Sequence, residues 1–179
     1  MAEEPKTVSL EAVLDERERR ARRQTALLRQ HGRTLISLTM NLAGPVKTGP
    51  LPDACFDSGV AAVRDKAGQS GFGILHFEET ESPAGRAAFF VVDAPALAVK
   101  RLACAIEGEH PAGRLLDIDV LDTDGEKLTR RQVGEGPRRC LVCHQPAAQC
   151  ARSRAHGLDA VMAETEKLLR RWAAEEAPV

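Results

Sequence analysis

The order in which hydrophobic patterns follow one another is the feature that most restricts the fold of this chain. Alternating or continuous apolar residues predict strands over 33–40, 72–80, 86–93 and 114–122. Helical spacing predicts helices over 53–69 and 94–109, which separate the first strand from the second and the third from the fourth. This alternation is the order of the split βαβ arrangement. We therefore expect an α+β fold, a single domain over residues 1–179 with one antiparallel sheet.

Two further helices are predicted at the ends of this unit. Apolar residues recur at helical spacing over 9–30, where Ser9 is suited to be the N-cap and Gly32 to end the helix. Residues 157–175 carry a stripe of large apolar side chains that ends at Trp172, which is typical of an amphipathic helix. The chain is thus expected to begin and end with a helix that packs one face on the protein.

Three local features complete the expected fold. Asp53 is expected to cap the helix 53–69, because a carboxylate accepts hydrogen bonds from the first backbone N–H groups. Residues 127–133 follow a "DTDGE" turn and are expected to pair with the strand before them as a hairpin. Residues 1–8 are expected to be disordered.

Charge and composition exclude several classes of function. The net charge of −1 and the scarcity of aromatic residues (no Tyr, one Trp and five Phe) argue against a nucleic-acid-binding protein. No segment approaches the roughly 20 apolar residues that cross a bilayer. The first 20 residues lack the apolar segment of a secretory signal, so we expect a cytoplasmic protein without membrane contact. In that compartment the five cysteines indicate metal binding, catalysis or burial rather than disulfides.

The segment "PRRCLVCHQPAAQCARSRAH", residues 137–156 and hereafter the cysteine segment, carries a C-x2-C-x6-C-x5-H pattern. Its members are Cys140, Cys143, Cys150 and His156. Zinc favours four Cys or His ligands, and a C-x-x-C turn supplies two of them, so the spacing indicates a structural zinc site. His144 is a rival ligand. A redox dithiol, cysteines that are merely packed, and a nucleophilic Cys150 are the alternatives.

The strand "LLDIDVLD" places Asp117 and Asp119 two residues apart. Side chains at that spacing project from the same face of a strand, while Leu116, Ile118 and Val120 face the other way. Two carboxylates on one face can bind Mg²⁺ and place it beside a triphosphate, as in nucleotidyl transfer. The Gly-Ser that precedes such a pair in polymerase-beta-type enzymes is missing, and a strand with one polar face explains the pattern equally well.

Cationic residues surround these two motifs. Arginine binds phosphate well because its planar guanidinium can contact two oxygens at once. The candidate phosphate ligands are Arg114, Arg138, Arg139, Arg152 and, in a "GPVK" loop, Lys47. The run "DERERRARR" over 15–23 is instead expected to be a solvated helix face with internal ion pairs.

Two consecutive motifs, "GRLLDIDVLDTDGEKLTRR" and "PRRCLVCHQPAAQCARSRAH", resemble those of the citrate lyase holo-acyl-carrier-protein synthases. Members of this family are apo-citrate lyase phosphoribosyl-dephospho-CoA transferases. The segments "LDERERRARRQ" and "LISLTMNLAGPVK" are similar to the opening segments of the same family. The resemblance runs from about residue 10 to about residue 170 and carries little motif information over 53–108.

This resemblance implies a transferase. A serine of the apo acyl carrier protein of citrate lyase would attack the α-phosphorus of triphosphoribosyl-dephospho-CoA, and pyrophosphate would leave. Asp117 and Asp119 would then hold Mg²⁺, the arginines would bind phosphates, and His110 or His156 would take the serine proton. Zinc in the cysteine segment would be structural. The alternatives are a zinc-stabilised adaptor that binds a carrier protein without catalysis, and a related nucleotidyltransferase for another carrier.

Overall fold

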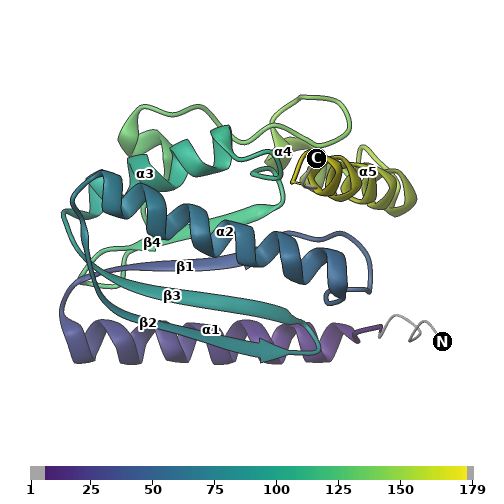
Figure 1. The fold of residues 1–179 in the computed structure, drawn as a ribbon. Helices are drawn as coiled ribbons and strands as arrows, with labels where there is room; N and C mark the ends of the chain where they lie inside the picture. The colour runs from purple at the N-terminus through teal and green to yellow at the C-terminus, as the bar shows by residue number, and fades with distance from the viewer. Residues whose placement is uncertain (1–6, 177–179) are drawn as a thin grey trace.

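The computed structural model describes residues 7–176, and the helices and strands within them follow the predicted order (Figure 1). The elements are α1 (Leu10–His31), β1 (Thr34–Met40), α2 (Pro50–Gln69), β2 (Gly73–Ser82), β3 (Gly85–Asp93), α3 (Ala96–Glu109), β4 (Leu116–Leu121), a 3-10 helix η1 (Arg130–Val133), α4 (Ala147–Ser153) and α5 (Leu158–Glu176).

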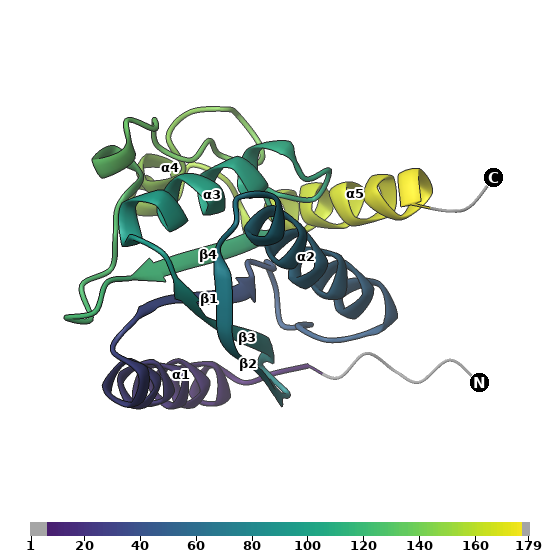
Figure 2. The same ribbon diagram turned by 60° about the vertical axis from the view of Figure 1, so that its left-hand side comes forward.

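The four strands form one antiparallel sheet in the order β2-β3-β1-β4. Helices α2 and α3 cover one face of this sheet, and α1 lies against the other (Figures 1 and 2). This is the split βαβ arrangement, so the predicted α+β class and the single antiparallel sheet are confirmed. Ser9 caps α1 by accepting a hydrogen bond from the backbone N–H of Ala12 at 3.2 Å, and Gly32 ends it with φ of 58°.

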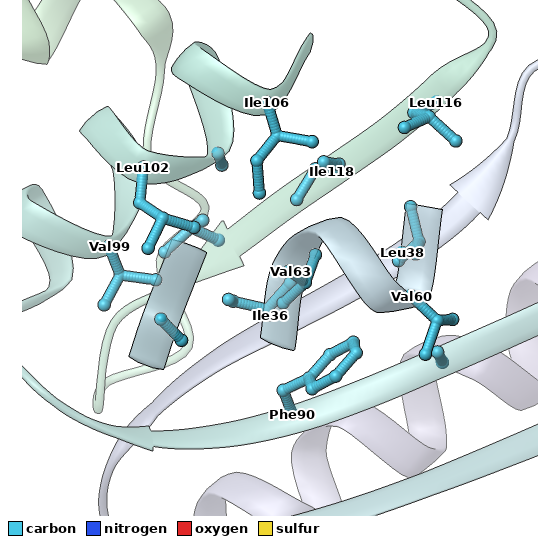
Figure 3. Close-up of a cluster of buried hydrophobic side chains, with 14 of the residues drawn as sticks. Ile36, Leu38, Val60, Val63, Phe90, Val99, Leu102, Ile106, Leu116 and Ile118 are labelled. Atoms are coloured by element: carbon cyan, nitrogen blue, oxygen red, sulfur yellow. The ribbon is translucent and has the colours of Figure 1, made fainter. Parts of the chain in front are cut away.

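Two apolar clusters hold the layers together. The larger one fills the space between the sheet and the helices α2 and α3, where Ile36, Phe90 and Ile118 point towards Val63 and Ile106 (Figure 3). A smaller cluster joins α1 to the opposite sheet face; it comprises Leu27, Leu28, Leu35, Ala87, Phe89, Val91 and Leu121. Burying apolar side chains on both faces of the sheet fixes its strand register, because a one-residue slip would turn every side chain to the wrong face.

The predicted C-terminal amphipathic helix is confirmed as α5, which packs outside the βαβ unit. Leu169 and Trp172 are buried against Leu115 and Ala112 of the segment before β4 and against Cys55 of α2. Helix α5 and the cysteine segment therefore lie at the end of the sheet where β1 ends and β4 begins (Figure 1).

Residues 127–133 do not form the predicted second strand of a hairpin. An isolated bridge joins Leu121 to Lys127, and the Leu128 N–H donates to the Val120 carbonyl at 2.8 Å, but the chain then turns into η1. Thr129 and Gln132 form a capping box, in which each side chain bonds the backbone of the other, and this stabilises a helical turn over an extended strand. The turn directs Arg130 back towards α3.

Three other local expectations are modified. Helix α2 begins at Pro50, three residues before the predicted cap, because Pro is suited to a first turn. Asp53 lies inside that turn and accepts a hydrogen bond from the Gly49 N–H at 3.1 Å. Thr7 and Val8, within the segment 1–8 that was expected to be disordered, pair with the loop after β1; residues 1–6 lie outside the described part of the chain.

The outer edge of β4 is covered by charged side chains. Glu107 of α3 is buried, and its carboxylate accepts hydrogen bonds from the Ile118 N–H at 3.1 Å and from Arg130 at 2.7 Å. Arg138 donates to the Leu116 carbonyl at 2.8 Å and to the Arg114 carbonyl at 3.0 Å. An open strand edge offers unpaired backbone groups to other chains, and these contacts satisfy them within the protein.

This arrangement predicts that substitutions of two neighbouring glutamates lower the stability of the protein by very different amounts. Glu107→Gln removes the charge that compensates Arg130 and should lower the free energy of unfolding by about 3 kcal/mol, as for other broken buried ion pairs. Glu109→Gln breaks an exposed pair with Lys66 and should cost less than about 1 kcal/mol. Urea unfolding of both variants measures the difference, and equal midpoints would contradict the role given to Glu107.

Candidate functional site

The two predicted aspartates lie together on the face of β4 that is turned away from α2 and α3. Their strand neighbours Leu116 and Ile118 point into the large apolar cluster, so the carboxylates project from the opposite face. Across the antiparallel pair with β1, Asp117 is opposite Thr39 and Asp119 is opposite Ser37. The structure thus brings the carboxylates and two hydroxyl residues to one polar corner of the sheet.

Each carboxylate at this corner has a cationic neighbour. Asp119 pairs with Lys127 at 2.6 Å, and the lysine side chain is 60% exposed. Asp117 lies 3.3 Å from Arg138 and is itself 42% exposed. Both carboxylates are therefore accessible to solvent. The partner of Asp119 is a lysine, whose flexible side chain another cation can displace.

A basic hollow opens beside Asp117, between the N-terminal half of α1 and the loop after β1. Two adjoining depressions of about 50 and about 130 Å³ make up this hollow. Arg17, Arg20, Lys47, Glu16 and Asp117 are among the residues that line it. Burial, and after it the charge of Arg17, lowers the pKa of the Lys47 ammonium, whose Nζ donates to the Leu42 carbonyl. Three cations and two carboxylates line the larger depression, so the hollow carries a small excess of positive charge that can hold an anion.

The prediction for the arginine run of α1 holds only in part. Arg19 and Arg22 pair with glutamates on the same helix, as expected of a solvated face, and Arg23 reaches Glu78 of β2. Arg17 and Arg20 line the basic hollow instead. Helical spacing could have indicated this position for Arg20. Residues 23, 20 and 16 are spaced so that they share a helix stripe with the buried Leu27, and that stripe faces the protein.

His110 is held on the other side of the sheet, away from the aspartates. Its Nδ1 accepts a hydrogen bond from the Ala112 N–H at 3.0 Å, and its Nε2 lies 2.9 Å from the Ser58 hydroxyl. Burial lowers the pKa of the imidazole, which favours the neutral form with its proton on Nε2. Both nitrogens are then engaged, and His110 joins α2 to the turn before β4.

The cysteine segment folds into a compact cluster of four donor atoms. The sulfur atoms of Cys140, Cys143 and Cys150 and a ring nitrogen of His156 all lie within 4.8 Å of one another. Four ligands around a tetrahedral zinc, with bonds of 2.1 to 2.3 Å, are separated by roughly 3.5–3.8 Å. The cluster can therefore hold a metal ion after small side-chain movements. His144, the rival ligand, is exposed and outside the cluster.

Backbone contacts support the Cys140 sulfur as a ligand. Burial alone would raise its pKa, but backbone N–H groups of Cys143 and Val142 donate to the sulfur, and the pKa of Cys140 is lowered overall. The pKa of Cys150 is raised to about 12, first by its hydrogen bond with Cys143. Thiolates this close repel one another, and a divalent cation removes that repulsion. Cys55 and Cys104 are buried in the protein away from this cluster.

The other predicted phosphate ligands occupy different surroundings. Arg138 contacts Asp117 and backbone carbonyls at the edge of β4, so its guanidinium is already hydrogen-bonded within the protein. Arg139 donates to the His144 carbonyl and lines a groove of about 580 Å³ together with Lys167 and Arg171. Arg152 is exposed on α4. The structure therefore brings Lys47 and Asp117 together and leaves Arg139 and Arg152 elsewhere.

Arg114 lies between the sheet corner and the cysteine segment. Burial and then the charge of Arg138 lower the pKa of its guanidinium. Within residues 7–176 this guanidinium has no hydrogen bond or ion pair, although it lines two grooves that meet at Cys140 and Leu141. The donors of this half-buried guanidinium are therefore available to an anion from outside the protein.

Comparison with known proteins identifies the family. Residues 8–172 match the family described as "Apo-citrate lyase phosphoribosyl-dephospho-CoA transferase". Proteins of that name from Citrobacter koseri and Escherichia coli are each 38% identical over 162 residues, which cover 90% of this chain and 88% of theirs. A Vibrio cholerae protein, "Probable apo-citrate lyase phosphoribosyl-dephospho-CoA transferase", is 36% identical over 163 residues, 90% of this chain and 92% of its own.

Two further findings concern membrane contact and the extent of the family match. Among the described residues, no helix is long and apolar enough to cross a membrane. The family match spans the basic hollow, the aspartate pair and the cysteine cluster, from α1 to the buried Trp172 of α5. The chain belongs to the apo-citrate lyase phosphoribosyl-dephospho-CoA transferase family.

Proposed function

We propose that this protein transfers the phosphoribosyl-dephospho-CoA group from triphosphoribosyl-dephospho-CoA to a serine of the apo acyl carrier protein of citrate lyase. The observation that carries the proposal is the basic hollow beside Asp117, in a chain that belongs to the family of that name. The serine oxygen forms a bond to the α-phosphorus, the bond from that phosphorus to the β-phosphate oxygen breaks, and pyrophosphate leaves. Such a transfer requires positioning and neutralisation of charge more than covalent help from the protein.

Arg17, Arg20 and Lys47 bind the triphosphate in this proposal. They come from α1 and from the loop after β1, so their charges converge on the hollow from two sides. Its two depressions, of about 50 and about 130 Å³, are each well below the roughly 300 Å³ at which pockets for small organic molecules begin. The hollow is therefore sized for phosphate groups rather than for a nucleoside, and the leaving pyrophosphate is the group that it stabilises.

Asp117 and Asp119 are the proposed Mg²⁺ ligands. Carboxylates and hydroxyls are the hard oxygen donors that Mg²⁺ prefers, and Thr39 and Ser37 lie opposite the two aspartates on β1. When bound, the ion would neutralise charge on the phosphate oxygens. Lys127 pairs with Asp119 at present and has a largely exposed side chain, so it can move aside at little cost.

The serine proton needs an acceptor near the hollow. His110 is engaged at both nitrogens on the far side of the sheet, and His156 is one of the four donors of the cysteine cluster. We therefore assign the proton to a carboxylate. Glu16 lines the hollow beside Asp117, which is already assigned to Mg²⁺, and it is buried there with Arg19 at 3.1 Å as an exposed partner. A carboxylate in this position can take the proton as the oxygen–phosphorus bond forms.

The cysteine cluster is proposed to bind a structural Zn²⁺ through Cys140, Cys143, Cys150 and His156. All four positions are filled by side chains, which is typical of structural rather than catalytic zinc. The exposed cations Arg139, Lys167 and Arg171 line the adjoining groove and suit an acidic carrier protein. Mixing the protein with apo-carrier, donor and Mg²⁺ tests the whole proposal: the carrier must gain the mass of the prosthetic group as pyrophosphate is released.

The aspartate pair gives the first of three predictions about the proposed function. Asp119→Asn removes one charge from the proposed Mg²⁺ site and should lower the transfer rate at least about 100-fold, or roughly 2.7 kcal/mol of barrier. Stability should change little, because the partner Lys127 is exposed. Asp124→Asn, in the exposed turn after β4, is the matched control and should keep the wild-type rate. A rate for Asp119→Asn within threefold of wild type would exclude the metal role.

The α1 arginines give the second prediction. Arg20→Gln should raise the KM for the donor about tenfold, the effect of losing a charged hydrogen bond, and leave the KM for the carrier unchanged. Arg22→Gln removes the same charge from the same helix, but Arg22 is 77% exposed and paired with Glu18, so its kinetics should match wild type. Equal effects of the two substitutions would indicate long-range attraction instead of a phosphate contact.

The cysteine cluster gives the third prediction. Protein purified without chelator should contain one Zn²⁺ per chain by elemental analysis, and Cys143→Ser should lose it and melt at a lower temperature. Cys104→Ser alters a buried cysteine outside the cluster and should retain the metal. Chelator should lower the melting temperature of wild type and of Cys104→Ser, and should not lower that of Cys143→Ser further. Wild-type protein without zinc, and insensitive to chelator, would leave the cysteines as packing residues.

A further inference from the structure

A further concave surface lies next to the cysteine cluster and is not used by the mechanism above. This groove, hereafter the α4–α5 groove, has a volume of about 610 Å³ and is bounded by α4, by the start of α5 and by Leu141. Its apolar wall includes Leu141, Ala151, Leu158 and Val161. The volume falls within the range of pockets that hold nucleotide-sized molecules, and it is several times that of the basic hollow.

Two arginines lie along this apolar surface. Arg114 is half-buried and, within the described residues, has no partner for its guanidinium. Arg154 ends α4 in a left-handed conformation with φ of 49°, which is uncommon for a residue other than glycine. An apolar wall with two guanidinium groups suits a ligand that is mostly uncharged and carries phosphate at one place.

The groove is continuous with the basic hollow. Asn41, the first residue after β1, lines both of them, and Arg114 precedes the strand that carries Asp117. In Figure 1 the N-terminal half of α1, the loop after β1, and α5 all lie at the same end of the sheet. One extended molecule can therefore place phosphates in the hollow and a larger, less charged part in the groove.

We propose that the α4–α5 groove binds the dephospho-CoA arm of the donor. In this arrangement the adenosine and pantetheine parts lie on the apolar wall, and Arg114 contacts the diphosphate between them. This inference rests on the proposed function for the identity of the donor. The groove fits this arm better than it fits the carrier protein, because it is concave and shares Asn41 with the hollow that holds the other end of the same molecule.

Calorimetry with dephospho-CoA and, separately, with pyrophosphate tests the assignment on the full chain. Ala151 is exposed in the groove wall, so Ala151→Phe fills the groove without touching the buried clusters. This variant should bind dephospho-CoA at least about tenfold more weakly and pyrophosphate as wild type does. Ala148→Phe, an exposed position on the same helix but outside the groove, is the matched control and should bind both ligands normally.

Arg114→Gln is a second variant that does not depend on the fit of a new side chain. It should weaken dephospho-CoA binding about tenfold, because a charged hydrogen bond to the diphosphate is lost, and should leave the melting temperature unchanged. Unaltered dephospho-CoA affinity in both variants would overturn the proposal. So would a defect of Ala151→Phe confined to the KM of the carrier protein, since the groove would then belong to the carrier.

The same measurements separate this inference from the proposed function. If wild-type protein binds dephospho-CoA through the groove but does not modify the carrier, the transferase assignment fails and the groove assignment stands. If the carrier is modified and Ala151→Phe has wild-type kinetics for the donor, the transferase assignment stands and the groove assignment fails. Absence of dephospho-CoA binding to wild type at millimolar concentration also overturns the groove assignment.

Discussion

The geometry of the aspartate pair on β4 depends on the contacts of one buried carboxylate, that of Glu107. It joins α3 to the backbone of β4 and holds Arg130, whose own position fixes the turn after the strand. Arg138, 3.8 Å from the same carboxylate, reaches around the strand edge to Asp117. A buried carboxylate is tolerated only when it is fully bonded, so this network constrains both the aspartate corner and the entry to the cysteine segment.

The fold could be predicted from the sequence because its determinants are local. Alternation in β1 and β4 and helical spacing in α2 and α3 are each set by nearby residues, and their order implies one antiparallel sheet. The orientation of Asp117 and Asp119 followed from the same alternation. The failure at residues 127–133 has a local and a tertiary cause. The capping box of Thr129 and Gln132 favours a helical turn, and that turn places Arg130 against Glu107, which is remote in sequence.

The roles of the arginines could not be predicted in the same way. The residue type of Arg138 and the motifs beside it indicate a phosphate ligand. Its guanidinium nevertheless contacts carbonyls at the edge of β4. Arg20 belongs to a run that resembles a solvated face, yet it lines the hollow. A guanidinium is available to a substrate only where the fold leaves it without an internal acceptor, and that condition depends on residues distant in sequence. The cysteine cluster was recognisable because its four members lie within 17 residues of one another.

The cysteine cluster also links metal binding to the shape of the substrate surface. Helix α4 has seven residues and none of them is fully buried, so helix propensity and packing stabilise its position only weakly. Its place is set by Cys150, whose sulfur lies 3.5 Å from that of Cys143 in the preceding turn. Cys143 in turn lies 3.1 Å from a ring nitrogen of His156 in the segment before α5. These three segments also form walls of the α4–α5 groove. A metal ion bound by the cluster would therefore fix the groove walls relative to β4, and under the proposed assignment it would influence how the donor is held without contacting the reacting phosphorus.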